Sequence, residues 1–438
     1  EHAVRPGAAF APGHLLGPQR KKRAKDKGDT STYFTLSFTV TFEHGVQPGA
    51  TGGEGDVCYI CQCYPYSHTR LTDHLSALSK APRHRAHLRV EELCATLGGL
   101  SVPLLTITDF SSPIQTLRSR PAVVITARVH PGETNASWMM HGVIDALLAD
   151  TPLASELRSW LVFKVVPSLN PDGVVLGNYR CSIAGEDLNR NWADPSPAKH
   201  PTIVHAKQLL ADLAAEERLL FFCDLHGHSR KKSAFMYGVE ASSKAAVTGT
   251  RLHERIFPLL LDRLTPHFSF SSCSYKVLRS KETTGRVVVG RSFGLVHSYT
   301  LEASFCGPDG PVAEGLAETH YSIRDLQGLG HAFVEALHDF ANPTHVAYNG
   351  ALAELEASYP PKDGGGGGGD GSEDDGADGD RDDSQANSRK GPTQIRRKAS
   401  NGTANSKGKT TRKASVDEAR KRKNNGAGSG GGSAASSK

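Results

Sequence analysis

The chain has 438 residues, enough for two or three domains, and a formal net charge of +5. Residues 361–438 hold 16 basic and 11 acidic residues, so residues 1–360 are neutral, which is atypical of a globular nucleic-acid-binding domain. No stretch approaches 18 consecutive apolar residues, and eight cysteines do not make a disulfide-rich domain, so we expect no membrane span and free thiols in the cytosol.

The first predicted elements are β-strands. Residues 1–30 are rich in proline and glycine and then basic, and we expect a linker there. Residues 32–42 and 57–64 alternate β-branched or aromatic residues with others, which predicts two strands. Such a two-stranded ribbon is marginally stable and must pack against another part of the protein. Cys58, Cys61 and Cys63 fall in the second strand and fit it better than a metal site.

From residue 67 onwards, short apolar runs alternate with helical stretches. The runs have the composition of buried strands and lie at 104–110, 121–129, 161–166, 219–225 and 296–301. Helices are predicted at 137–149, 201–217, 249–263 and 326–341. This alternation predicts an α/β domain with a mixed, mostly parallel sheet flanked by helices. Ligands of such sheets bind beyond the carboxyl ends of the strands.

Residues 346–438 are predicted to be a low-complexity, disordered tail. Within residues 361–438, only Ile395 and Val416 are large apolar residues, and 17 of the 45 glycines lie there, too little to offset the entropy of ordering. The net charge is −7 over 361–383 and +12 over 384–438. The tail is therefore either expendable or a tether to an acidic polymer, while its ARKRK run is alternatively a nuclear signal or a weak nucleic-acid contact.

Three predicted strands lead directly into side chains that bind metals or move protons. His130 and Glu133, in the sequence HPGE, follow one strand, while His226 and Glu302 each follow another. Two histidines and a carboxylate leave one position of a tetrahedral Zn²⁺ open, which is typical of catalytic sites. Each motif alone also fits a surface pair or a structural histidine, and His228 is an alternative to His226.

The motifs NPDG at 170–173 and LNRNW at 188–192 complete a recognisable order. HPGE, NPDG, LNRNW, DLH and a late glutamate resemble the zinc metallocarboxypeptidases of the carboxypeptidase A type. Longer stretches are more specifically similar to the cytosolic carboxypeptidases, the family of tubulin deglutamylases, and lie at 63–75, 127–142, 166–192, 224–238 and 297–307. The resemblance covers residues 31–341.

This resemblance implies a zinc carboxypeptidase catalytic domain over residues 67–345. It also implies that residues 31–66 are the remnant of an N-terminal β-sandwich domain. One Zn²⁺ would be bound by His130, Glu133 and His226, and Glu302 would be the general base that takes a proton from water and delivers it to the leaving amine.

The resemblance further implies a set of substrate-binding residues. Arg180 would stabilise the developing oxyanion, and Asn189 and Arg190 would hold the terminal carboxylate, which makes the enzyme an exopeptidase. Lys281 and Arg286 lie in the region that matches the wall of the specificity pocket. We expect one or both to select glutamate, with Arg286 preferred; the alternative is that both are loop charges.

The predicted function is that of a zinc metallocarboxypeptidase that removes C-terminal or side-chain-linked glutamate, chiefly from polyglutamylated tubulin and other proteins with acidic carboxyl ends. We expect a cytoplasmic monomer, with microtubules, cilia and the nucleus as further locations, and no membrane or nucleic-acid partner. A zinc-dependent small-molecule deacylase of the same fold and a non-catalytic microtubule-binding relative are the alternatives, and the LNRNW motif favours the peptidase.

Overall fold

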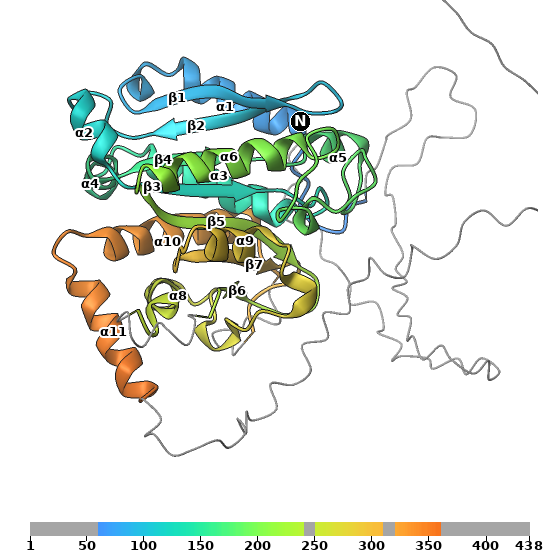
Figure 1. Cartoon of the computed structure of the whole chain (residues 1–438). Helices are drawn as coiled ribbons and strands as arrows, with labels where there is room; N and C mark the ends of the chain where they lie inside the picture. Colours follow the sequence, from blue (N-terminus) through green and yellow to red (C-terminus); the bar gives the residue numbers. More distant parts are fainter. Residues whose placement is uncertain (1–59, 241–249, 310–319, 361–438) are drawn as a thin grey trace, which may run out of the picture. The chain divides into compact units, whose positions relative to one another are not determined.

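The computed structural model describes residues 60–240, 250–309 and 320–360, which are built around a seven-stranded sheet (Figure 1). The strands run in the order β1-β2-β4-β3-β5-β7-β6. Strands β4, β3, β5 and β7 form a parallel centre, and the remaining neighbours pair antiparallel. The predicted mixed α/β sheet is therefore confirmed. The strand bounds are β1 Leu88–Ala95, β2 Ser101–Ile107, β3 Ala122–Ala127, β4 Val162–Val166, β5 Leu219–His228, β6 Ala234–Tyr237 and β7 Ser298–Ser304.

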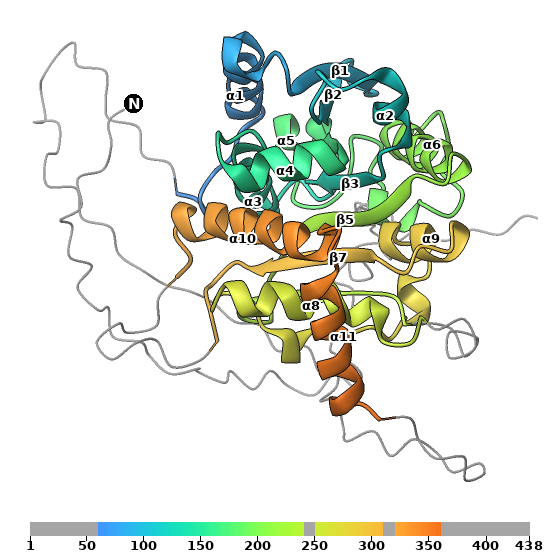
Figure 2. The same cartoon turned by 90° about the vertical axis from the view of Figure 1, so that its left-hand side faces the viewer.

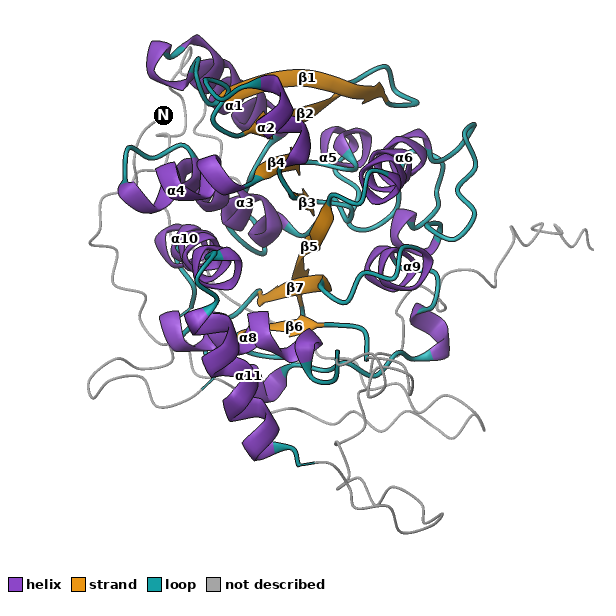
Figure 3. Cartoon of the chain, turned by 60° about the vertical axis from the view of Figure 1, so that its left-hand side comes forward, coloured by secondary structure: helices purple, strands orange, loops and turns teal. Residues whose placement is uncertain are grey.

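Helices cover both faces of the sheet (Figure 3). One layer contains α3, α4, α8 and α10, and the other contains α5, α6 and α9. The helix bounds are α1 His68–Lys80, α2 Ile114–Ser119, α3 Thr134–Leu147, α4 Pro152–Trp160, α5 Pro171–Leu176, α6 Pro201–Ala215, α8 His253–Leu264, α9 Gly285–Ser292, α10 Ile323–Ala341 and α11 Val346–Ser358. Short 3₁₀ helices are η1 Pro82–His84, η2 Leu188–Arg190, η3 Phe270–Ser272 and η4 Arg279–Lys281.

Strand β5 shows how the pleat fills both hydrophobic layers. Successive side chains of a strand point to opposite faces, so Phe221 and Phe222 enter different cores. The Phe221 ring lies 4.7 Å from Phe257 of α8, whereas the Phe222 ring lies 6.0 Å from Trp192. A strand buried on both faces reads as a continuous apolar run, which is why this one was predictable.

Helices α3 and α10 cross in very close contact on one face of the sheet (Figure 2). A Cβ at Gly142 would lie 2.1 Å from the carbonyl oxygen of Gln327, and a Cβ at Gly330 would lie 2.2 Å from that of Met139. The two glycines allow the backbones to touch, which fixes the position of α3 over the sheet. This matters for the site, because the residues before α3 carry two of the predicted metal ligands.

The described part of the predicted N-terminal β domain contains no strand. Residues 60–66 form a loop, so the strand predicted over 57–64 is wrong for its described end. The loop packs on the α/β domain instead: the Tyr66 and Trp138 rings meet edge to face at 4.8 Å, and Trp138 Nε1 donates to the Tyr64 carbonyl at 3.2 Å. The rest of the predicted β-sandwich remnant lies outside the described residues.

The predicted tail boundary at residue 346 is also wrong. Residues 346–358 form helix α11, whose Ala351 and Leu355 are buried in the same core as α8 and α10. The hydroxyl of Tyr348 lies 2.7 Å from Nδ1 of His253, which ties α11 to α8. The α/β domain thus extends beyond residue 345, and the expectation for residues 361–438 falls outside the described part. Among the described residues, no helix has the length and apolarity needed to cross a membrane.

Candidate active site

A sharp turn after β3 directs the HPGE motif. Arg128 has a left-handed backbone, with φ of 57°, which is strained for a residue with a side chain. Its buried guanidinium donates to the carbonyls of Pro131 at 2.8 Å and Tyr66 at 3.1 Å, and to Ser137 Oγ at 2.8 Å. These bonds offset the strain and place His130 at the end of the parallel strands.

His130, Glu133 and His226 form a buried cluster in which one ligand atom of each lies within 4.8 Å of the others. His130 Nδ1 is 2.6 Å from Glu133 Oε1, and His226 Nδ1 is 2.8 Å from Glu133 Oε2. The Gly227 amide also donates to Oε2, at 3.0 Å. A Cβ at position 227 would lie 3.0 Å from the Phe305 ring and 3.3 Å from the side chain of Glu133, so glycine permits this approach.

Two aspartates, the buried Asp224 and the half-buried Asp187, hold the opposite sides of the histidine rings. His130 Nε2 lies 3.1 Å from Asp187 Oδ1, and His226 Nε2 lies 2.8 Å from Asp224 Oδ2. Carboxylates commonly orient metal-ligating histidines in this way, and here they leave both Nδ1 atoms toward Glu133. Neither aspartate was predicted from the sequence. Asp224 carried a usable signal, because it precedes His226 by two residues and so shares its face of the strand.

The cluster is arranged to keep its carboxylates ionised. Burial alone would raise the pKa of Glu133, but the charges of His130 and His226 hold it well below its usual range. Burial likewise opposes the lowered pKa of Asp187, where the hydrogen bond from His130 and the charge of Arg180 outweigh it. Buried negative charge of this kind must be balanced by protons on the rings or by a cation.

Glu302 lies beside this cluster, opposite His226 in the parallel register of β5 and β7. Its Oε2 atom is buried and receives no hydrogen bond from the described residues. Burial raises the pKa of Glu302, against the lowering effect of the His226 charge. The sequence predicted that His226 and Glu302 follow their strands directly. Both lie inside the strands instead, because pairing continues to His228 and Ser304.

Arg180, Asn189 and Arg190 surround the same cluster. Nε and Nη2 of Arg180 contact Asp187 Oδ2 at 2.8 and 2.7 Å, while Arg190 Nη1 is 3.8 Å from that oxygen. Asn189 accepts from the Gly285 amide at 2.9 Å, and its Nδ2 lies 3.4 Å from His226 Nε2. The structure therefore brings all three residues beside the predicted ligands.

Arg286 and Lys281 occupy different environments. Arg286 lies in α9 with 5% of its surface exposed, donates to the Gly238 carbonyl and places its guanidinium carbon 5.3 Å from the centre of the Tyr237 ring. Lys281 is half-buried at the end of η4. The alternative that Arg286 is a loop charge is wrong. The role of both side chains in a specificity pocket stays a prediction.

His228, the alternative ligand, is not part of the cluster. Its Nδ1 accepts hydrogen bonds from the backbone amides of Arg230 at 3.2 Å and Lys231 at 2.9 Å. Those bonds use the ring to cap the turn that follows β5. The geometry thus favours His226 as the ligand.

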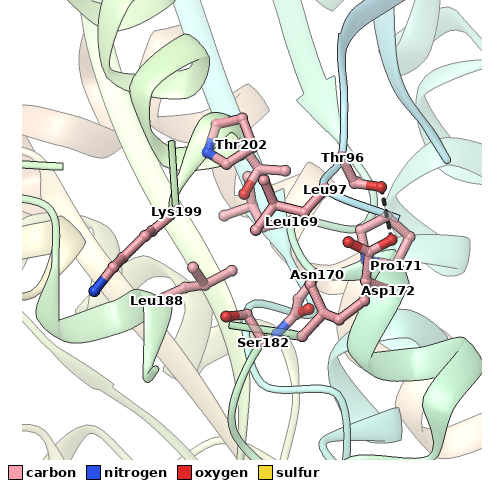
Figure 4. Close-up of a pocket in the computed structure, with 12 residues that line it drawn as sticks. Thr96, Leu97, Leu169, Asn170, Pro171, Asp172, Ser182, Leu188, Lys199 and Thr202 are labelled. Carbon is pink, nitrogen blue, oxygen red and sulfur yellow. Dashed lines mark hydrogen bonds between the residues drawn. The ribbon is translucent and has the colours of Figure 1, made fainter. Parts of the chain in front are cut away.

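The structure also contains a separate recess (Figure 4). It encloses about 240 Å³, including space open to solvent, and is lined by residues such as Thr96, Asn170, Ser182 and Leu188. Its acidic side chain, Asp172, accepts from Thr96 Oγ1 at 2.6 Å and from the Gly98 amide at 3.0 Å. Asp172 therefore serves the fold, and none of the cluster residues lines this recess.

Comparison with known proteins agrees with this geometry. Residues 73–247 match the model of a family described as zinc carboxypeptidase. This stretch of the chain therefore resembles the zinc carboxypeptidases. The chain is 42% identical over 344 residues to cytosolic carboxypeptidase 3 of Mus musculus, covering 78% of this chain and 33% of the relative. It is 45% identical to cytosolic carboxypeptidase 1 of Danio rerio, covering 74% and 29%. The resemblance predicted from the motifs is confirmed, and the chain spans about a third of these relatives' length.

Solved structures share the fold. A metallo-carboxypeptidase from Burkholderia cenocepacia aligns with a TM-score of 0.54 and 27% identity, covering 64% of this chain and 70% of that one. A metallo-carboxypeptidase from Pseudomonas aeruginosa aligns with a TM-score of 0.52 and 24% identity, covering 63% and 68%.

The residues present fit the zinc ion that this family name implies. The donor set of two imidazole nitrogens and one carboxylate suits Zn²⁺, and all three side chains are buried. Both rings are fixed through Nε2, which leaves Nδ1 for a ligand bond. Glu302, whose Oε2 is buried and receives no hydrogen bond from the described residues, lies beside them.

Proposed function

We propose that the domain is a zinc metallocarboxypeptidase in which His130, Glu133 and His226 hold the metal. The observation that carries this proposal is the buried three-residue cluster with Glu302 in register beside it. When bound, the ion supplies Lewis acidity, which polarises a carbonyl and lowers the pKa of water.

Side chains of this chain then transfer the proton, stabilise the oxyanion and bind the substrate carboxylate. Glu302 accepts a proton from water at Oε2 and returns it to the leaving nitrogen. Arg180, oriented by Asp187, donates to the developing oxyanion, a contribution of about 3 kcal/mol. Asn189 and Arg190 hold the free carboxylate of the substrate, which an internal peptide bond lacks.

We further propose that the residue released is glutamate. Arg286, with Lys281 as the alternative, would pair with the glutamate side chain. Polyglutamylated tubulin fits this chemistry because its glutamate chains end in free carboxylates. The similarity to proteins named cytosolic carboxypeptidases supports action in the cytoplasm on protein carboxyl ends. The charged segment at 361–438 would raise the local concentration of an acidic polymer.

The test is to incubate the zinc-loaded chain with polyglutamylated tubulin and with a synthetic peptide ending in glutamates, and to follow both by mass spectrometry. We expect stepwise loss of glutamate from both substrates. The same peptide with an amidated carboxyl end should remain intact, because Asn189 and Arg190 then have no free carboxylate to bind. Retention of every glutamate by folded, zinc-bound protein would refute the proposal, and cleavage of an N-acyl amino acid alone would indicate the deacylase.

Asp224→Asn should weaken zinc binding about 10- to 100-fold. The carboxylate accepts from Nε2–H of His226, whereas an amide can donate to Nε2 and thereby move the ring proton to Nδ1, the nitrogen that faces Glu133. The measurement is competition with a chelator, and Asp212→Asn, on the exposed face of α6, is the control. Equal zinc affinity in both variants would show that Asp224 does not position His226.

A further inference from the structure

A second group of potential metal ligands lies between α1 and α3. It consists of His74 from α1 and His141 and Asp145 from α3, with one ligand atom of each within 4.8 Å of the others. His141 is seven residues beyond the start of α3 at Thr134, roughly 10 Å along the helix axis, so this group is distinct from the cluster that precedes α3.

The spacing on the helices explains why the side chains converge. His141 and Asp145 are four residues apart and so share one face of α3. His141 Nε2 lies 3.4 Å from Asp145 Oδ2, and His74 Nε2 lies 3.5 Å from Asp145 Oδ1. With bonds of about 2.1 Å, neighbouring ligands of a tetrahedral ion lie about 3.4 Å apart, which matches both separations.

Each histidine ring presents its Nε2 atom toward the Asp145 carboxylate, so the three side chains offer two imidazole nitrogens and one carboxylate to a single point. His74 Nε2 is buried, and no described residue forms a hydrogen bond with it.

Tyr66 orients the second ring. Its hydroxyl lies 3.1 Å from His141 Nδ1 and can accept the proton of that nitrogen, leaving Nε2 with a lone pair toward Asp145. The two histidine rings stack with centroids 3.7 Å apart and planes 22° apart, so an ion requires them to tilt toward each other. Arg70 carries a positive charge that opposes the binding of a metal ion. Its guanidinium carbon lies 5.1 Å from the centre of the Trp138 ring.

We propose that His74, His141 and Asp145 bind a second divalent transition-metal ion of the zinc class, which joins α1 to α3. Neutral imidazoles with one carboxylate favour Zn²⁺, Co²⁺ or Ni²⁺ over Mg²⁺ or Ca²⁺. The carboxylate compensates part of the charge of the ion, and its side chain is 40% exposed, so water can complete the coordination. This site does not depend on the proposed catalytic function.

The test is equilibrium dialysis of the full chain against chelator-buffered Zn²⁺, with bound metal counted by mass spectrometry. We expect two equivalents for the unchanged chain and one for His141→Gln. Asp145→Asn should weaken the second equivalent at least tenfold while the first is retained. His205→Gln, an exposed histidine on α6, is the matched control and should bind two equivalents.

Thermal unfolding supplies a second readout. The second equivalent should raise the melting temperature of the unchanged chain and of His205→Gln, but not that of His141→Gln, because only the former gain the link between α1 and α3. Equal melting temperatures of all variants in excess chelator would show that each folds. A metal content that is the same in the unchanged chain, in His141→Gln and in Asp145→Asn would overturn the proposal, whatever the number of equivalents bound at the other cluster.

Discussion

Glu302→Gln should lower kcat on a glutamate-ended peptide about 10²- to 10⁴-fold while zinc remains bound. Glutamine keeps the shape of the side chain but cannot accept a proton from water. The three cluster residues are unchanged, so metal content should equal that of the unchanged chain. The measurements are kcat at saturating peptide and zinc content after gel filtration.

Glu92→Gln is the matched control for this change. Glu92 is an exposed glutamate on edge strand β1, so the same substitution there should leave kcat unaltered. Glu302 differs from Glu92 in that its Oε2 is buried without a hydrogen bond from the described residues. The substitution at Glu302 therefore tests the proton transfer itself. A Glu302→Gln variant that binds zinc and keeps kcat within tenfold would remove Glu302 from the proton transfers.

The central strands and long helices could be predicted because their sequence patterns match their burial. The apolar runs became β3, β4, β5 and β7, and the periodic stretches became α3, α6, α8 and α10. Short elements were missed because tertiary contacts decide them. Three consecutive valines at 287–289 resemble a strand, yet they lie in α9, which Gly285 allows to pack against the Trp192 ring.

The NPDG motif shows the same limit on a local scale. Its residue types are typical of a turn, but Asn170 caps a helix by accepting from the Gly173 amide at 3.0 Å, and Pro171 fits the first helical position. The helix ends at Gly177, whose φ of 72° suits glycine. Turn and helix start share their residue preferences, so sequence alone cannot separate them.

Within the candidate site, the residues in the motifs were predicted from the sequence, whereas the two aspartates that orient the histidine rings were not. His130, Glu133 and His226 stand in recognisable motifs that the structure brings together. Asp187 and Asp224 act through hydrogen bonds to the rings, and of the two only Asp224 left a signal in the sequence, its two-residue step to His226. The burial of Arg286 depends on the Gly238 carbonyl and the Tyr237 ring, contacts that form only after β6 and α9 have packed.

Arg286→Met should lower kcat/KM for a peptide ending in glutamate about 10- to 100-fold and change a glutamine-ended peptide far less. A hydrogen-bonded charge contributes about 1.5–3 kcal/mol, and only the glutamate side chain can use it. Methionine fills similar space without charge, whereas a glutamate at this buried position would leave an unpaired charge. The measurement is kcat/KM for the two peptides, which both keep the terminal carboxylate.

Arg291→Met on the same helix separates selectivity from general effects. Arg291 pairs with Glu282 at 3.3 Å on the exposed side of α9, so its loss should leave both peptides unaffected. Arg286→Met also removes the donor to the Gly238 carbonyl, so its melting temperature must be compared as well. Equal losses on both peptides would assign Arg286 to the fold alone. Unchanged selectivity would transfer the role to Lys281, where Lys281→Met should then produce the difference between the peptides.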